Sequence, residues 1–273
     1  MGRMTKKKRR AGRAGNAYAF LVYAFIYIPI LVMMVFSFND QRQNYYWKSF
    51  TWKWYEKLFT HSSIVEYFWN SIFVAVTATV LSVIIGTIGA MGLIRYNYKL
   101  RQMTSNALYI PIVVPEIVLG LSLLMLYETV HMPLGFAAII LAHITFCIPF
   151  VIIIMRGRMA GMDKSVEEAS MDLGANRITT FRRVTLPMLV PGILSSVFMS
   201  FTLSLDDVII SNFVSGPYST TLPVKILSMV KNGLSPEINA LTTIMVLVML
   251  LGILLNLLVQ SLLKKRDLAK ANM

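Results

Sequence analysis

Long apolar segments alternate with short polar ones along most of the chain. A helix needs about 20 mostly apolar residues to cross the hydrocarbon core of a bilayer, and six segments meet this requirement. They are Tyr18–Phe38, Ser71–Ile94, Ala107–Tyr127, Leu134–Met155, Met188–Val214 and Leu241–Leu263. The pattern predicts an all-α membrane protein with six transmembrane helices. The helices would form one domain over residues 17–263, between a basic N-terminus at 1–16 and a tail at 264–273.

The composition supports a membrane location and excludes several kinds of site. Of the 273 residues, 56% are hydrophobic and only 14% are charged, which is too apolar for a soluble domain of this length. Cys147 is the single cysteine, and the three histidines, His61, His131 and His143, are scattered. We therefore expect no disulfide framework, no metal site and no cofactor. His143 lies inside a span and is expected to be a hydrogen-bonded polar group of the bundle.

The net charge of +13 follows the predicted topology. Of the 26 Lys and Arg residues, 20 precede the first span, follow the last, or lie between spans two and three or four and five. The positive-inside rule then places both termini in the cytoplasm. The basic run Lys6–Arg10 orients the first span, which lacks a cleavage site and should remain as an anchor. This distribution argues against a nucleic-acid partner.

Two features of the third span point to an irregular helix that carries an acid. Pro111 and Pro115 prevent an unbroken hydrogen-bond ladder, so we expect a kink. Glu116 follows the second proline directly. Broken helices are tolerated in membranes where they face protein or a watery cavity, so this carboxylate is a candidate for such a cavity.

The fifth span contains a second pair of acids, Asp206 and Asp207, with Ser204 just before them. On one continuous helix the two side chains would point about 100° apart, so only one would face a cavity. Carboxylates are costly inside a bilayer and usually face a bundle interior or water. No span contains Lys or Arg to neutralise these acids. We expect a negative cavity that favours cations; the alternative is that the acids only hydrogen-bond within the bundle.

All four tryptophans lie in the first outer loop, between Asn39 and Asn70. Trp47, Trp52 and Trp69 fit an aromatic belt at the membrane interface. Trp54 fits either this belt or a face for a cationic ligand, because a protonated amine is attracted to the indole ring. In the second large outer loop, Pro223–Val230 should form a short helix that either lies on the membrane surface or closes the top of a pore.

The polar segment between the fourth and fifth spans, at about residues 156–187, has the signals of two short helices. Ser165 and Glu168 have capping-box spacing, Gly174 supplies a C-terminal stop, and a second helix, Ile178–Thr185, should end at Leu186–Pro187. Four residues provide an apolar face for a groove on another protein: Ala169, Leu173, Ile178 and Phe181. No phosphate-binding loop motif occurs, so any ATP-driven motor must be a separate chain.

These residues resemble a known motif. Glu168-Ala169, Gly174 and Val184-x-Leu186-Pro187 are similar to the E-A-A-x3-G-x9-I-x-L-P loop of permease subunits in type I ABC importers, with Ser170 and Val184 as mild departures. The resemblance implies that this loop docks into an ATP-binding subunit dimer. Glu168, Ala169, Gly174, Leu186 and Pro187 would then be coupling residues.

A closer resemblance extends over nearly the whole chain, to the second permease subunit of spermidine/putrescine importers. The matching strings are K-W-Y at 53–55, H-I-T-F-C-I-P-F at 143–150, S-F-T-L-S-L-D-D-V at 200–208 and the stretch 222–241. It implies a bacterial cell membrane, a partner permease, an extracytoplasmic polyamine-binding protein, and a path lined or gated by Trp54, Glu116, Asp206 and Asp207. Rival hypotheses are an importer of thiamine or a ferric complex and, in another class, an intramembrane aspartyl hydrolase that uses Asp206 and Asp207.

Overall fold

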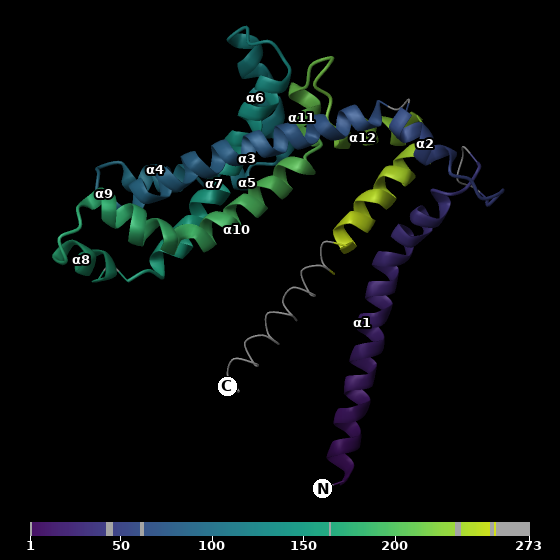
Figure 1. Cartoon of the computed structure of the whole chain (residues 1–273), viewed down its shortest axis with the longest axis horizontal. Coiled ribbons are helices and arrows are strands. Elements are labelled where there is room, and N and C mark those ends of the chain that lie inside the picture. Colours follow the sequence, from purple (N-terminus) through teal and green to yellow (C-terminus); the bar gives the residue numbers. More distant parts are fainter. Residues whose placement is uncertain are drawn as a thin grey trace, which may run out of the picture. The chain divides into compact units, whose positions relative to one another are not determined.

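The computed structural model describes residues 2–41, 46–60, 63–163, 165–232, 236–251 and 254, and these are almost entirely helical. Within them, the β pairing is one isolated bridge, Asn39 with Phe50. Figure 1 labels the α-helices. The elements are α1 Gly2–Phe36, α2 Lys53–Thr60, α3 Ile64–Arg95, α4 Arg101–Ala107, α5 Ile110–Val113, α6 Glu116–Thr129, α7 Phe136–Ala160, α8 Ser165–Asp172, α9 Arg177–Thr180, the π-helix η1 Phe181–Thr185, α10 Leu186–Leu205, α11 Ile209–Val214 and α12 Leu222–Asn232.

Four helical segments are long and apolar enough to cross a membrane: Tyr18–Phe36, Ile64–Arg95, Phe136–Ala160 and Arg177–Leu205. A fifth is obtained if the bent pair Arg101–Val113 and Glu116–Thr129 counts as one span. The predicted sixth span, Leu241–Leu263, begins in the shorter apolar helix Pro236–Leu251 and continues mostly outside the described residues. The all-α membrane class is therefore confirmed, whereas the count of six remains a prediction.

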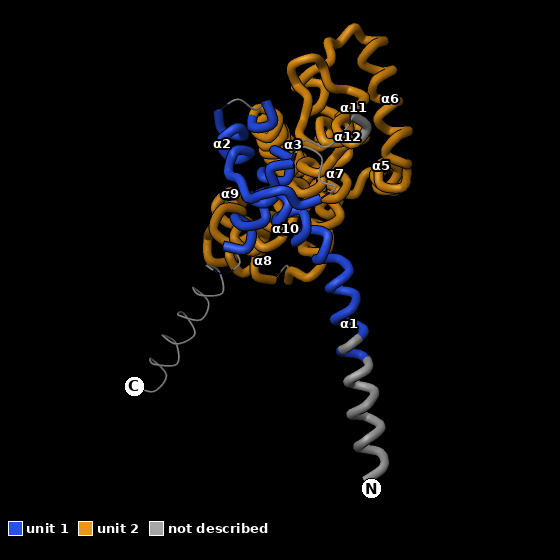
Figure 2. Tube along the Cα trace, turned by 90° about the vertical axis from the view of Figure 1, so that its right-hand side faces the viewer, with its two compact units in different colours: residues 1–65, 232–273 blue, residues 66–231 orange. Residues whose placement is uncertain are grey.

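The chain divides into two compact units (Figure 2). Unit 1 comprises residues 1–65 and 232–273, and unit 2 comprises residues 66–231. Unit 2 contains the bent pair, the α8–α9 segment and the two aspartates.

The core of unit 2 is built on α7, which packs against α10 (Figure 1). Small residues four apart on α10 allow a close approach, as they commonly do between membrane helices: Gly192, Ser196, Ser200 and Ser204 are all buried. The Cys147 thiol of α7 lies 3.7 Å from the Ser200 carbonyl oxygen, and Arg158 Nε donates to the Met188 carbonyl at 2.8 Å. The helices are therefore antiparallel and share a narrow seam.

The predicted kink of the third span is confirmed as a complete break. The segments on its two sides are bent by 107° relative to each other. Val114 and Pro115 are both extended, with ψ of 130° and 134°. Proline has no backbone N–H and forces the preceding residue out of the helical region. One helix therefore ends at Val113, and the next begins at Glu116.

The prediction of one continuous helix over Met188–Val214 is wrong. Helix α10 ends at Leu205, and α11 begins at Ile209. The Asp207 carboxylate accepts hydrogen bonds from the backbone N–H groups of Ile210 and Ser211, at 3.2 and 2.7 Å. An aspartate that bonds nearby backbone in this way competes with the helix ladder and starts a new helix. The acids therefore interrupt the span.

The predicted end of the second cytoplasmic helix at Leu186–Pro187 is also wrong. Helix α9, η1 and α10 form one helical segment, Arg177–Leu205. The Leu186 N–H bonds to the Phe181 carbonyl five residues back, which is a π-type turn. Pro187, which has no backbone N–H, follows directly after this turn.

The short outer helix predicted at Pro223–Val230 is confirmed as α12. It is attached to the start of α3: the Leu222 N–H donates to Ser71 Oγ at 2.8 Å, and Asn70 Nδ2 donates to the Thr220 carbonyl at 3.1 Å. Lys225 Nζ lies 5.2 Å from the centroid of the Tyr67 ring. These contacts fix α12 along the first turns of α3.

Candidate functional site

The α8–α9 segment is shaped by local capping. Gly174 has φ +89°, a left-handed conformation that favours glycine, and it ends α8 as predicted. Its N–H bonds to the Met171 carbonyl at 2.9 Å, and the Ala175 N–H bonds to the Ser170 carbonyl at 3.2 Å, which satisfies carbonyls at the end of the helix. Asn176 Oδ1 accepts from the Thr179 N–H at 2.8 Å and caps α9.

The start of α8 differs from the predicted capping box. Helix α8 begins at Ser165 itself, so this residue lies inside the helix and not at the cap position that the box requires. Asp163 Oδ1 accepts from the Ser165 N–H at 2.9 Å. Hydrogen bonds from the Ser165 backbone and side chain lower the pKa of the Asp163 carboxyl below its usual value. Asp163 therefore supplies the acceptor at this helix start.

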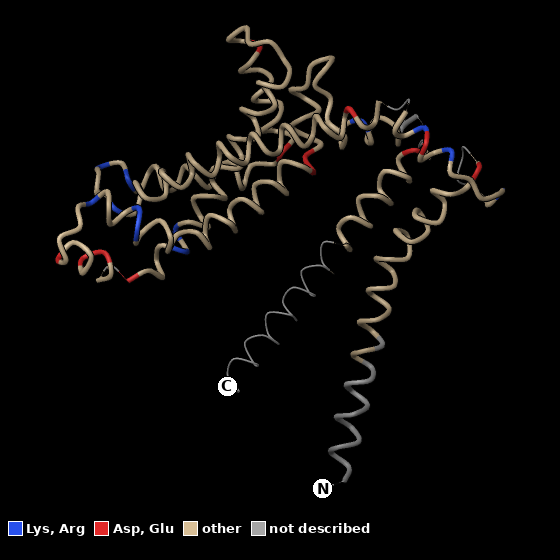
Figure 3. Tube along the Cα trace, in the orientation of Figure 1, with Lys and Arg blue, Asp and Glu red and all other residues tan. Residues whose placement is uncertain are grey.

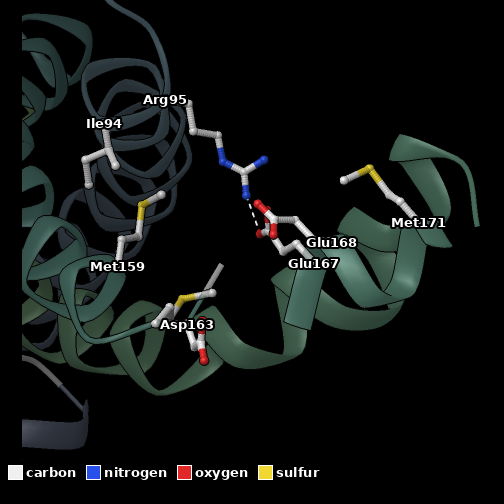
Figure 4. A pocket seen from close by; sticks show the side chains of 8 residues that line it. Ile94, Arg95, Met159, Asp163, Glu167, Glu168 and Met171 are labelled. Atoms are coloured by element: carbon white, nitrogen blue, oxygen red, sulfur yellow. Dashed lines mark hydrogen bonds and ion pairs between the residues drawn. The ribbon is translucent and has the colours of Figure 1, made fainter. Parts of the chain in front are cut away.

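Glu167 anchors α8 to its surroundings. Its carboxylate pairs with Arg95 at the end of α3 and accepts from Thr185 Oγ1 of η1 at 2.6 Å. A pocket of about 290 Å³ lies here, and Figure 4 shows Glu167 and Glu168 pointing towards Arg95. The lining residues are Ile94, Arg95, Met159, Met162, Asp163, Glu167, Glu168 and Met171. Sequence reasoning selected Glu168 and missed Glu167, whose partners lie 72 and 18 residues away.

Two substitutions of Glu167 should separate its two contacts. Glu167→Gln removes the charge but keeps an acceptor for Thr185, and a partly exposed ion pair contributes about 0.2–1 kcal/mol. Glu167→Ala also leaves the buried Thr185 hydroxyl without this acceptor, which costs about 1–3 kcal/mol more. We expect the thermal midpoint of the detergent-purified protein to fall further for Ala than for Gln. Equal shifts would show that the Thr185 contact contributes nothing.

The five predicted coupling residues lie at the surface of unit 2, and Glu168 is among those that line this pocket. Glu168, Ala169 and Gly174 are exposed on and after α8, and Leu186 and Pro187 are exposed at the start of α10. Two residues of the predicted apolar face, Leu173 and Ile178, are 90% and 66% exposed. The basic residues of unit 2 are distributed unevenly, because most of its Lys and Arg positions lie at the end that carries α4, α8 and α9 (Figure 3).

The acids of the fifth span lie at the opposite end of α10, where a buried polar cluster surrounds Asp207. His143 of α7 is fully buried; its Nδ1 lies 2.6 Å from Ser204 Oγ, and its Nε2 lies 3.0 Å from Ser211 Oγ. The same Nε2 lies 3.3 Å from Asp207 Oδ2. Asp207 is 8% exposed. His143 is therefore the hydrogen-bonded bundle residue that its position in a span predicted.

The two remaining acids of the predicted path are exposed within unit 2. Asp206 is the C-cap residue that directly follows α10, and Glu116 is the first residue of α6. The two breaks belong to neighbouring elements, because α6 packs against α11 (Figure 1). The approach is close: a Cβ atom on Gly120 would lie 2.9 Å from Phe213 Cδ2 and 3.3 Å from Ile210 Cα. Both broken spans thus carry an acid beside the break.

Trp54 lies in unit 1 on α2 and is 7% exposed. Its Nε1 donates to the Asn39 carbonyl at 2.7 Å, which fixes the indole ring. Lys53 Nζ lies 4.6 Å from the ring centroid and also pairs with Asp40; this hydrogen bond lowers the pKa of the Asp40 carboxyl. The ring face therefore already lies beside an ammonium group of its own chain. Trp47, Trp52 and Trp69 are each about half exposed or more.

Comparison with known proteins identifies the family. Residues 78–267 match the binding-protein-dependent transport system inner membrane component family. This match covers more than half of the chain, so the chain belongs to that family and is a multi-pass subunit of a transport system.

Two curated relatives are similar over nearly their full length. The spermidine/putrescine transport system permease protein PotC of Haemophilus influenzae is 42% identical over 244 residues, which is 89% of this chain and 95% of the relative. PotC of Escherichia coli K12 is 39% identical, over 92% and 93% of the two chains. The putrescine transport system permease protein PotI of the same strain is 39% identical over 82% of each chain.

Solved structures support the fold. A bacterial ABC transporter chain involved in the import of alginate aligns with a TM-score of 0.69 at 17% identity and covers 93% of this chain and 96% of that chain. An inward-facing MetNI methionine ABC transporter chain aligns with a TM-score of 0.56 at 21% identity, over 71% and 90%. The predicted importer permease fold is confirmed by these two alignments.

Proposed function

We propose that the chain is a permease subunit of an ATP-driven importer that moves spermidine and putrescine across a bacterial cytoplasmic membrane. The observation that carries this proposal is the similarity to PotC, at 42% and 39% identity over about nine tenths of the chain. The acids of unit 2 fit this proposal. A linear polycation needs carboxylates for its ammonium groups, and Glu116 and Asp206 are exposed beside the two breaks, with Ser204 and Asp207 next to Asp206. In unit 1, the indole ring of Trp54 is the proposed aromatic group.

The proposed importer needs at least three kinds of partner. ATP hydrolysis belongs to a separate dimer of ATP-binding subunits, because the sequence has no phosphate-binding loop. A second permease subunit completes the path, and an extracytoplasmic binding protein delivers the polyamine. Both termini are cytoplasmic in this proposal, as the distribution of Lys and Arg predicts.

In the proposed mechanism, the ATP-binding subunits act on the surface formed by α8 and the start of α10. Glu168, Ala169, Gly174, Leu186 and Pro187 form the coupling contact, and exposed Leu173 supplies apolar area for it. Glu167 links α8 to α3 through Arg95 and to η1 through Thr185. A displacement of α8 would therefore be transmitted to the span of α3 and to the span that contains η1 and α10. Closure of the ATP-binding subunits then opens the path outward by largely rigid-body motion. An inside-negative membrane potential favours cation entry by about 2.3 kcal/mol per charge per 100 mV.

ATPase stimulation in a reconstituted complex tests the substrate assignment. The chain is purified with its ATP-binding subunit, partner permease and binding protein, and placed in liposomes. We expect spermidine and putrescine to stimulate ATP hydrolysis and thiamine or a ferric complex to leave it at the basal rate. Stimulation by thiamine or a ferric complex, and none by either polyamine, would assign the chain to an importer of another substrate.

A further inference from the structure

The two adjacent aspartates have opposite surroundings. Asp207 is buried, and its two carboxylate oxygens accept backbone N–H groups of Ile210 and Ser211, with His143 Nε2 3.3 Å from Oδ2. Asp206 is exposed, and its own N–H closes the last turn of α10 on the Thr202 carbonyl at 3.2 Å. Hydrogen-bond donors therefore surround the Asp207 carboxylate, whereas Asp206 lies at the C-terminal end of α10.

The position of Asp206 favours a cation beside its carboxylate. The C-terminal end of a helix carries partial negative charge from its free carbonyl groups, and this favours cations there. Helix α10 has 20 residues, so its C-terminal end adds to the negative charge of the side chain. Where two nearby carboxylates differ in environment, they take different roles. Asp206 suits the binding of an ammonium group, and Asp207 suits a structural role.

His143 holds this difference in place. It is fully buried and touches three successive parts of the break: Ser204 near the end of α10, Asp207 in the connection, and Ser211 in α11. All three contacts can form with one tautomer of the imidazole ring. In that tautomer, Nε2–H points to Asp207 and Ser211, and Nδ1 accepts from the Ser204 hydroxyl. The edge of the ring also packs on Phe146, with centroids 5.3 Å apart. Helix α7 thereby fixes where α10 stops.

We propose that His143 is a positioning residue for substrate binding. It fixes the break between α10 and α11, so that the Asp206 carboxylate alone takes an ammonium group of the substrate and Asp207 holds the break. The identity of the substrate as a polyamine rests on the proposed function above. The division of roles between the aspartates rests on the contacts of His143 and Asp207, which do not depend on that identity.

A double-mutant cycle tests the proposal. Spermidine uptake is measured as KM and maximal rate for the complete importer in liposomes, with His143→Phe, Asp206→Asn and both together. We expect Asp206→Asn to raise KM at least tenfold and His143→Phe to raise it severalfold, with the double variant no worse than Asp206→Asn alone. Such non-additivity links residues that act through one structure. His143→Gln, which keeps a donor near Asp207, should recover much of the affinity, and Glu128→Gln on α6 is the matched control for loss of an acid.

Thermal unfolding of the same variants supplies an independent readout. Asp207→Asn should lower the thermal midpoint of the complex, because the carboxylate accepts two backbone donors. Asp206→Asn should leave the midpoint unchanged or raise it, because it removes a negative charge from the C-terminal end of α10. Two results would overturn the positioning role. In one, the fold changes in KM of the single variants multiply in the double variant; in the other, His143→Phe has the KM of the wild type. If His143→Phe does not assemble, His143→Leu, which also lacks the ring nitrogens, takes its place in the cycle. A wild-type complex that takes up no polyamine would overturn the proposed function, while the order of thermal midpoints still decides the roles of the aspartates.

Discussion

Gly174→Asp is expected to reduce uptake at least tenfold while the protein still inserts and folds. A Cβ atom built at this position has no atom of the described residues within 4 Å beyond its chain neighbours. The change therefore acts through the left-handed backbone, at φ +89°, and through the surface that faces the proposed ATP-binding subunit. The added charge and bulk would enter the docking turn. Uptake of spermidine into liposomes measures the effect.

Gly174→Asn is the matched control for this substitution. Asparagine and aspartate have nearly the same size and both tolerate the left-handed region, so the comparison isolates the negative charge. We expect Asn to retain more uptake than Asp. Normal uptake by Gly174→Asp, with the usual amount of ATP-binding subunit co-purifying, would contradict a docking role for this turn.

Gly192→Leu should prevent the isolation of a folded complex. A Cβ atom at this position would lie 2.9 Å from both Cβ and Cγ of Arg158 and 3.2 Å from Met155 Sδ. The Arg158 atoms are close to the backbone of α7, so the two helices would have to separate. Overpacking by a few atoms costs about 1–3 kcal/mol, while replacing a helical glycine by alanine recovers about 1 kcal/mol. Gly192→Ala already introduces this Cβ contact, so it should lower the yield of folded complex moderately, and Gly192→Leu should lower it far more.

Gly157→Leu provides the control for the glycine-to-leucine change. Gly157 lies in α7, which packs against α10, and no atom lies within 4 Å of a Cβ built on it. We expect this variant to yield as much folded protein as the wild type, measured by size-exclusion chromatography in detergent. Equal yields from Gly192→Leu and Gly157→Leu would show that the α7–α10 seam is not tightly packed.

The two helix breaks show how far the sequence carries a prediction of this fold. The break in the third span could be predicted, because Pro115 removes a donor and restricts Val114 through local chemistry alone. The break in the fifth span could not be predicted, because an aspartate can lie within a helix or cap the start of a new one, and the local sequence does not distinguish these roles. Which role Asp207 takes depends on His143, which lies on another span.

The coupling segment shows the same limit. The stop at Gly174 is a local property, and it was predicted correctly. The role of Glu167 depends on Arg95 and Thr185, which reach it only in the folded unit, so spacing rules favoured Glu168 instead. The continuation through Pro187 was missed because the π-type turn of η1 has no clear sequence signal.

The proposed function requires that the chain acts as a gate that ATP hydrolysis by another protein drives. The most direct test measures ATP turnover and spermidine accumulation by liposomes that contain either the purified chain alone or the complete importer. We predict no ATP turnover and no accumulation by the chain alone, and both activities in the complete complex. ATP hydrolysis or solute accumulation by the chain without accessory subunits would contradict the account.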